Sequence, residues 1–195
     1  MQPLFLGSHP AIDFLNTAFA PDGEPIETMG DGRAYVEWLV AAGLLKDADA
    51  AKLSRRFGAR ALDAAAAEAR KTREWAREWL TAWRAAPRAD YAGRVEILNR
   101  LLAREVVNRK LVANNGDFEL REAPSFESAQ ALLALPAAQL ALLLAQEDPA
   151  LVRECAGDSC TLWFLDRTKS HRRLFCSAAA CGNRAKVAAF RERQK

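Results

Sequence analysis

The sequence is poor in the residues and motifs on which common catalytic sites depend. Its 195 residues include only two histidines, His9 and His171. It has no phosphate-binding glycine loop, no nucleophile elbow and no dinucleotide-binding glycine fingerprint. Enzymes that rely on these motifs are therefore excluded, and we expect a protein without catalytic activity.

Signals for export or membrane insertion are also missing. The first twenty residues lack a basic n-region, and Asp13 interrupts their apolar stretch, so they do not resemble a signal peptide. The most apolar run, 131–145, is short for a bilayer span and contains Pro136 and Gln139. We expect a soluble cytoplasmic protein with no membrane partner.

β-Branched residues are scarce, whereas alanine and leucine dominate, and this composition favours helices. Asp31 is a good N-cap for a helix that ends near Gly43, and Asp47 is a candidate cap for a helix that breaks near Gly58. Apolar residues then recur at helical spacing over 59–85, and Pro87 ends this stretch. Asp90 is expected to start a further helix that reaches Val106.

The second half of the helical region carries clear turn signals. Asn115-Gly116 predicts a short β-hairpin between 110–113 and 118–121. Ser125 and Ser128 precede an apolar helix that runs to about Gln146, which Pro136 should end or kink. Pro149 is expected in the first turn of a short helix that leads to Cys155. These patterns predict a mainly α protein, with a helical domain over 1–150 and a cysteine module over 151–195.

All four cysteines lie within 27 residues of one another, in the arrangement C-x4-C-x15-C-x4-C. Two close pairs joined by a longer arm match a tetrahedral four-thiolate zinc site formed by Cys155, Cys160, Cys176 and Cys181. The alternatives are two disulfides, four free thiols or an iron–sulfur cluster. A reducing compartment disfavours disulfides. Because four thiolates leave no open coordination position, we expect one structural Zn²⁺ ion.

The arm between the two cysteine pairs resembles a hairpin, in which 162–165 and 173–175 flank a polar turn over 166–172. After Cys181, the run 183–193 predicts a helix with Val187 and Phe190 facing inward and a basic outer face. A knuckle, a hairpin and a helix together form a treble-clef-like zinc finger.

Positive charge is concentrated in the cysteine module. From Arg153 onward ten Lys/Arg stand against four Asp/Glu, so this segment has a net charge of +6, whereas the preceding part carries −3. Such an imbalance indicates a polyanionic partner, with a solvated basic tail as the alternative.

Two segments resemble known families. The tetrapeptide Cys181-Gly-Asn-Arg184, with Leu162-Trp-Phe-Leu-Asp-Arg-Thr and Arg172-Arg173 upstream, resembles the CGNR zinc finger. Asp13-Phe-Leu-Asn-Thr17 is similar to the D-F-x-N-T signature of the ABATE domain, which usually precedes that finger. One departure is Leu174-Phe175, where Arg-Trp is more typical. The resemblance implies a bacterial, stress-responsive transcription regulator with an N-terminal sensing domain and a C-terminal DNA-binding zinc module.

The basic residues of the module, together with Asn183, are the candidates for nucleic-acid contact. They lie on the polar turn and on the terminal helix: Arg167, Lys169, Arg172, Arg173, Asn183, Arg184, Lys186, Arg191 and Arg193. For Asn183 and Arg184 the alternative is structural support of the zinc site. Asp166 is expected to fix Arg172 or Arg184.

In the N-terminal domain, a small-molecule effector site would use His9, Asp13, Asn16 and Arg33. The alternative is that Asp13 and Asn16 cap a helix or pair with buried backbone. The Trp75–Trp79–Trp83 stripe predicts a core face or the seam of a homodimer. Three functions therefore stay open: a DNA-binding transcription regulator, a protein-interaction adaptor, and a ligand-binding protein in which the finger is only a structural staple.

Overall fold

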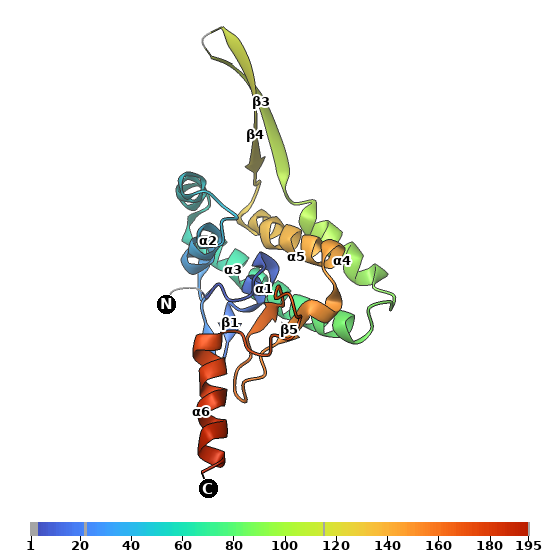
Figure 1. The fold of residues 1–195 in the computed structure, drawn as a ribbon. Helices are drawn as coiled ribbons and strands as arrows, with labels where there is room; N and C mark the ends of the chain where they lie inside the picture. Colours follow the sequence, from blue (N-terminus) through green and yellow to red (C-terminus); the bar gives the residue numbers. More distant parts are fainter. Residues whose placement is uncertain (1–3, 22, 115, 195) are drawn as a thin grey trace.

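The computed structural model describes residues 4–21, 23–114 and 116–194 and shows the mainly α protein that the sequence predicts (Figure 1). The N-terminal part contains α1 (Pro10–Leu15), β1 (Ala18–Phe19), β2 (Ile26–Glu27), α2 (Gly32–Ala41), α3 (Asp47–Ala85) and α4 (Ala92–Leu102). A hairpin and a second helical stretch follow, formed by β3 (Val106–Asn114), β4 (Asp117–Ser125), the 3₁₀ helix η1 (Ala129–Leu133) and α5 (Ala134–Gln146). The C-terminal part comprises the 3₁₀ helix η2 (Pro149–Leu151), β5 (Val152–Glu154), β6 (Trp163–Leu165), the π-helical turn η3 (Ala178–Gly182) and α6 (Asn183–Glu192).

Helix α2 begins directly after Asp31, the N-cap residue that the sequence predicts. The Asp31 carboxylate accepts a hydrogen bond from the Ala34 N–H at 2.8 Å, which satisfies an otherwise unpaired donor of the first turn. Its first residue, Gly32, lies directly against α3, because a Cβ at that position would sit 2.3 Å from the backbone carbon of Leu62. Glycine therefore permits the close crossing of α2 and α3.

Helix α3 confirms the predicted break but not the predicted cap. Lys46 occupies the N-cap position and Asp47 is the first helical residue, so the prediction of Asp47 as the cap is wrong. Gly58 has φ 73°, in the left-handed region that glycine adopts without strain, and it divides α3 into two helical segments. Trp79 and Trp83 are buried in the main core, so the tryptophan stripe is a core face.

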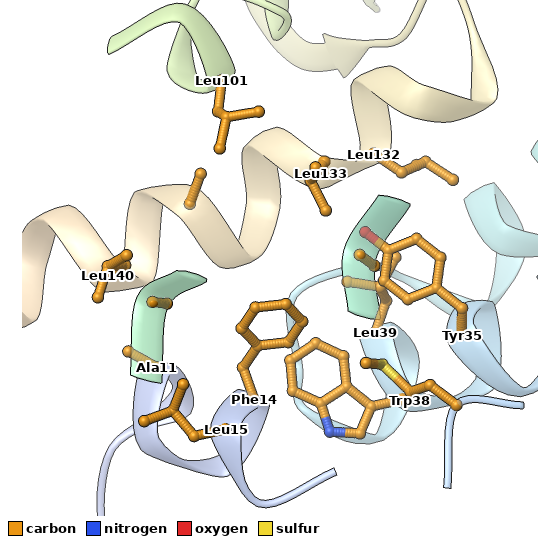
Figure 2. Close-up of a cluster of buried hydrophobic side chains, with 14 of the residues drawn as sticks. Ala11, Phe14, Leu15, Tyr35, Trp38, Leu39, Leu101, Leu132, Leu133 and Leu140 are labelled. Carbon is orange, nitrogen blue, oxygen red and sulfur yellow. The ribbon is translucent and has the colours of Figure 1, made fainter. Parts of the chain in front are cut away.

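The main core lies where α1, α2, α3 and α5 converge, and Figure 2 shows Phe14 packed against Trp38 with Leu133 above them. The rings of Phe14 and Trp38 are 5.5 Å apart, centroid to centroid. Pro136 lies in the first turn of α5 and does not end the helix, which continues to Gln146; the turn before it, η1, is 3₁₀ rather than α. The stretch Ala129–Gln146 is apolar and long enough to cross a bilayer, but 56% of it is buried, as in a core helix.

The hairpin β3–β4 is much longer than the four-residue strands predicted for it. Nine residue pairs are in register, from Val106 opposite Ser125 to Asn114 opposite Asp117. Of the predicted turn, Asn115 lies outside the described residues, and Gly116 has φ 94°. The hairpin leaves the helical body as an arm (Figure 1), and Leu111, Phe118 and Leu120 on it are exposed.

Candidate metal centre and nucleic-acid interface

The four cysteines meet in one buried cluster, as their spacing predicts. Cys155 follows β5, Cys160 precedes β6, Cys176 precedes η3, and Cys181 lies within η3. Their Sγ atoms all lie within 4.8 Å of one another. The Sγ atoms of Cys160 and Cys176 are 3.9 Å apart, and those of Cys176 and Cys181 are 3.6 Å apart.

These distances fit one tetrahedral zinc ion. Zn–S bonds of about 2.3 Å in a tetrahedron place the sulfurs about 3.8 Å apart, far beyond the roughly 2 Å of a disulfide. All four donors are protein thiols, so the ion is fully enclosed and structural. The module therefore binds one structural Zn²⁺ ion.

The four buried cysteines need a cation to be stable together as thiolates. Burial raises the pKa of the Cys176 and Cys181 thiols, and the neighbouring Cys155 and Cys160 add to this effect. Burial alone would also raise the pKa of Cys155, but the backbone N–H groups of Cys176 and Gly157 lower it instead. Four thiolates at this separation repel one another, and a divalent ion at their centre compensates that repulsion.

The predicted pairing of the zinc hairpin is wrong. Strand β6 pairs antiparallel with β5, so that Val152 lies opposite Leu165 and Glu154 opposite Trp163, and segment 173–175 is not its partner. The first cysteine pair thus lies in the loop that joins the two strands. Leu174 still contributes, because its carbonyl accepts a hydrogen bond from the Ala156 N–H.

The outer edge of β6 is covered by the beginning of the chain. We call residues 7–20 the N-terminal strip. The Leu165 N–H donates to the Gly7 carbonyl at 2.8 Å, and Thr161 and Ala20 exchange two further hydrogen bonds. Between these contacts, the side-chain amide of Asn16 pairs with the backbone of Trp163: its Oδ1 accepts from the N–H and its Nδ2 donates to the carbonyl, both at 2.8 Å. These contacts from Gly7, Asn16 and Ala20 therefore take the place of a neighbouring strand and close an otherwise open sheet edge.

Asn16 is therefore a structural residue, as the alternative interpretation predicts, and the other candidate effector residues also have structural partners. Asp13 accepts the Gly7 N–H at 2.7 Å, and burial raises its pKa to about 6. His9 Nδ1 caps α1 by accepting the Ala11 N–H. Arg33 lies on α2, forms an exposed ion pair with Glu37, and lines a separate surface cavity of about 560 Å³ between α2 and α3. His9, Asp13 and Asn16 therefore lie together on α1 and its caps, whereas Arg33 lies apart from them on α2.

Three arginines that the sequence does not single out hold residues between Leu15 and Gly30 against α3. Arg70, Arg73 and Arg77 lie at helical spacing on α3. Arg73 is buried and forms a bidentate ion pair with Glu27, and it also donates to the Thr17 hydroxyl. The signal in the sequence is a charged residue within the apolar face of α3, and such a residue requires a partner when buried.

Arg173 is fully engaged within the protein rather than presented to a ligand. Its guanidinium donates to the carbonyls of Leu6, Phe175 and Cys176 and to the Ser8 hydroxyl, and it lies 4.2 Å from the ring centroid of Phe164. It thereby ties the third zinc ligand to the start of the chain.

Asp166 does not fix Arg172 or Arg184 as predicted, because its fully buried carboxylate holds the turn that follows β6. It accepts hydrogen bonds from the Thr168 N–H and hydroxyl and from the Arg173 N–H. Burial alone would raise the pKa of Asp166, but these donors, together with Arg153, lower it. The carboxylate therefore stays ionised inside the module.

Two further predicted DNA residues have intramolecular partners. Arg184 donates to the Pro21 carbonyl at 2.9 Å and lies 3.0 Å from the Cys181 sulfur, which is the support of a zinc ligand that the alternative interpretation predicts. Arg167 forms an ion pair with Glu147 at 2.7 Å. Each contact fixes the zinc module to another part of the chain.

The remaining predicted residues lie on the outside of the module. Lys169 and Arg172 occupy the exposed turn, and α6 carries Lys186, Arg191 and Arg193 into solvent. All residues of α6 are exposed except Ala185, which is half-buried. The prediction that Val187 and Phe190 face inward is therefore wrong: they are 41% and 55% exposed. Figure 1 shows α6 projecting from the body with the C-terminus at its tip.

Comparison with known proteins agrees with this architecture. The CGNR zinc finger model matches residues 152–194, and the ABATE model, described as "Putative stress-induced transcription regulator", matches residues 8–147. No curated protein matches the chain. The ABATE match spans most of the 195 residues, and the finger match contains all four zinc ligands. The chain therefore belongs to the ABATE family and carries a CGNR zinc finger at its C-terminal end.

Proposed function

We propose that this protein is a bacterial transcription regulator that binds DNA through α6 and the adjacent basic turn. The observation that carries the proposal is the projection of α6 from a rigid zinc module, with Lys186, Arg191 and Arg193 exposed along it. Lys169 and Arg172 extend the positive surface onto the turn. These five cations, on a segment of net charge +6, suit a polyanion.

The zinc ion has an indirect role in this proposal. It joins β5, β6 and η3 around a single centre, and α6 continues directly from η3. Arg184 links the Cys181 sulfur to the carbonyl of Pro21, just after β1, so the first turn of α6 is fixed both to the metal site and to the N-terminal part of the chain. The metal thus orients the cationic helix and performs no chemistry of its own.

A mobility-shift titration tests DNA binding. If about four of the five cations contact phosphates, affinity for duplex DNA should fall about 100-fold between 50 and 200 mM salt. Arg191→Glu/Arg193→Glu should weaken binding strongly and reduce the salt slope by about 2. A matched control, Arg55→Glu/Arg60→Glu, changes net charge equally at exposed positions of α3 and should leave affinity near that of the wild type.

Absence of any shift at 50 mM salt with zinc-loaded protein would refute DNA binding and favour an adaptor that meets an acidic protein. Equal loss in the two double variants would show that only net charge matters, so α6 would not be the interface.

The remaining functional assignments are parts of the same proposal. We infer a cytoplasmic regulator without catalytic activity, controlled by a small-molecule effector through the ABATE domain and acting as a homodimer. The family description supports the regulatory role. Because the tryptophan stripe is buried in the core, a dimer would use another surface. Sedimentation at micromolar concentration measures the oligomeric state.

A further inference from the structure

Helix α6 presents three distinct faces. With 3.6 residues per turn, residues at positions i, i+4 and i+7 share one face. Asn183, Val187 and Phe190 have this spacing and are all exposed, and we call them the α6 ridge. Phe190 and Val187 are large apolar side chains in contact with solvent, so their apolar surface contributes little burial free energy in the isolated chain.

Basic residues flank the α6 ridge on both sides. Arg184 and Arg191, seven residues apart, lie along one side, and Lys186 and Arg193, also seven apart, lie along the other. Arg184 is held by Pro21 and the zinc site, which leaves Arg191 as the outer cation of its side. The acid of the helix, Glu192, lies about 180° from the ridge.

The opposite face of α6 is made of small residues that approach the module. Ala185 and Ala189 line an apolar surface cavity of about 570 Å³ together with Leu174 and Phe175. Ala185 and Ala188 line a second cavity beside Gly157. Because alanines face the body, the ridge points away from it, toward whatever binds the projecting helix.

The dimensions of α6 match the major groove of B-DNA. Its ten residues span about 15 Å, or about four base pairs, and a major groove about 12 Å wide admits one helix. In that position the two basic flanks meet the phosphates on either side of the groove, and the α6 ridge meets base edges.

The chemistry of the ridge distinguishes between base pairs. An asparagine amide pairs with the N6 and N7 atoms of adenine, and apolar side chains contact the methyl group of thymine. Against Val187 and Phe190, a G·C pair would instead leave polar base atoms without partners. We propose that the α6 ridge reads an A·T-containing core of about three to four base pairs, with Asn183 on an adenine and Val187 and Phe190 on thymine methyl groups. This inference rests on the proposed DNA-binding function.

An acidic amphipathic helix of a protein partner could also meet an apolar ridge between basic flanks. Two observations favour DNA over such a partner. The ridge begins with an exposed amide rather than an apolar residue, and outward cations lie on both sides of it, Arg191 on one and Lys186 and Arg193 on the other. Paired rows of phosphates on the two sides of a groove provide the same arrangement of charge.

Selection from random duplexes, with full-length zinc-loaded protein, tests the inference. Wild-type protein should enrich sites with consecutive A·T pairs. Asn183→Ala should relax discrimination at one adenine by about 5- to 150-fold. Val187→Ala/Phe190→Ala should lose selection at the neighbouring thymines but keep its affinity for unselected DNA and its salt slope, because the phosphate contacts remain. Val95→Ala, at a 45% exposed valine of α4, is the matched control and should keep the wild-type site.

Deoxyuridine in place of thymidine removes only the methyl group. In the selected site this change should weaken wild-type binding about fourfold for each contacted thymine and should not affect Val187→Ala/Phe190→Ala. Enrichment of G·C cores, or equal deoxyuridine sensitivity in wild type and variant, would overturn the ridge assignment while leaving DNA binding intact. Failure of wild-type protein to bind any duplex at 50 mM salt would instead refute the underlying function.

Discussion

Two elements leave the helical body in opposite directions, the β3–β4 arm and α6, and they are attached in different ways (Figure 1). The arm is held by its own cross-strand pairing. In contrast, α6 continues from a module that is fixed by zinc, by the N-terminal strip and by Arg173.

The two projections also differ in charge. Residues 106–125 contain three basic and three acidic residues, whereas the segment from Arg153 onward has a net charge of +6. Register places Leu111 opposite Leu120 and Ala113 opposite Phe118, so one face of the arm is apolar near its tip. Projection alone therefore does not make a DNA-binding element, and we expect the zinc-anchored end to carry both stability and DNA affinity.

Removal of one zinc ligand should have the largest effect. We expect Cys176→Ser to lose its bound zinc, to abolish DNA retardation and to lower the free energy of unfolding by at least about 5 kcal/mol, because Val152, Trp163 and Leu165 of the module belong to the main core. Metal analysis, mobility shifts and denaturant titration measure these changes. Retention of wild-type stability after zinc loss would contradict the dependence on the metal.

Asn16→Ala should have the next largest effect. It leaves the N–H and carbonyl of Trp163 buried without their partner, at a cost of about 2–4 kcal/mol. Asn108→Ala, at an exposed position of the arm, is the matched control and should change stability by less than about 0.5 kcal/mol. Equal losses of unfolding free energy for the two substitutions in urea titrations would show that the zinc-anchored end and the β3–β4 arm do not differ in their contribution to stability.

Asp13 should make stability depend on pH with a definite sign. Because burial raises its pKa in the folded state from 3.8 to about 6, the folded state holds the proton more tightly than the unfolded state. Stability should therefore fall as the pH rises from about 4 to about 6 and then level off. Asp13→Asn keeps the acceptor for Gly7 and removes this loss, so it should gain about 1–2 kcal/mol relative to wild type across that range. If the difference in unfolding free energy between Asp13→Asn and wild type stayed constant from about pH 4 to about pH 6, the raised pKa of Asp13 would be contradicted.

Replacement of 107–124 by a short glycine-containing turn should have the smallest effect. An isolated two-stranded hairpin adds little stability, so we expect changes within about 1 kcal/mol in unfolding and within about twofold in DNA affinity. A tenfold loss of affinity would make the arm part of the interface.

Local chemistry in the sequence predicted much of the fold and the metal site. The cap at Asp31, the break at Gly58 and the four cysteines depend on residues close in sequence, and the structure confirms all three. The partner of β6 could not be predicted in this way, because a three-residue strand has no pattern that selects β5 over 173–175. The pairing of Asn16 with Trp163 spans 147 positions, and no periodic signal connects them.

Val187 and Phe190 show a different limit. Their helical spacing predicts an apolar face, and α6 has one, but spacing does not reveal whether protein or solvent lies opposite.

The assignment of domains at residue 150 stays a prediction. The prediction of nine DNA-contacting residues could not foresee that Arg167, Arg173 and Arg184 have partners elsewhere in the fold.

The N-terminal strip limits how the finger can be recombined. Residues 152–194 grafted onto an unrelated domain would retain all four thiols but lose the amide of Asn16 and the carbonyls of Gly7 and Pro21. A functional chimaera would need to transplant 4–21 together with the finger. The two segments therefore form a single structural unit. This dependence gives a physical reason for the D-F-x-N-T signature and the CGNR tetrapeptide to occur in the same chain.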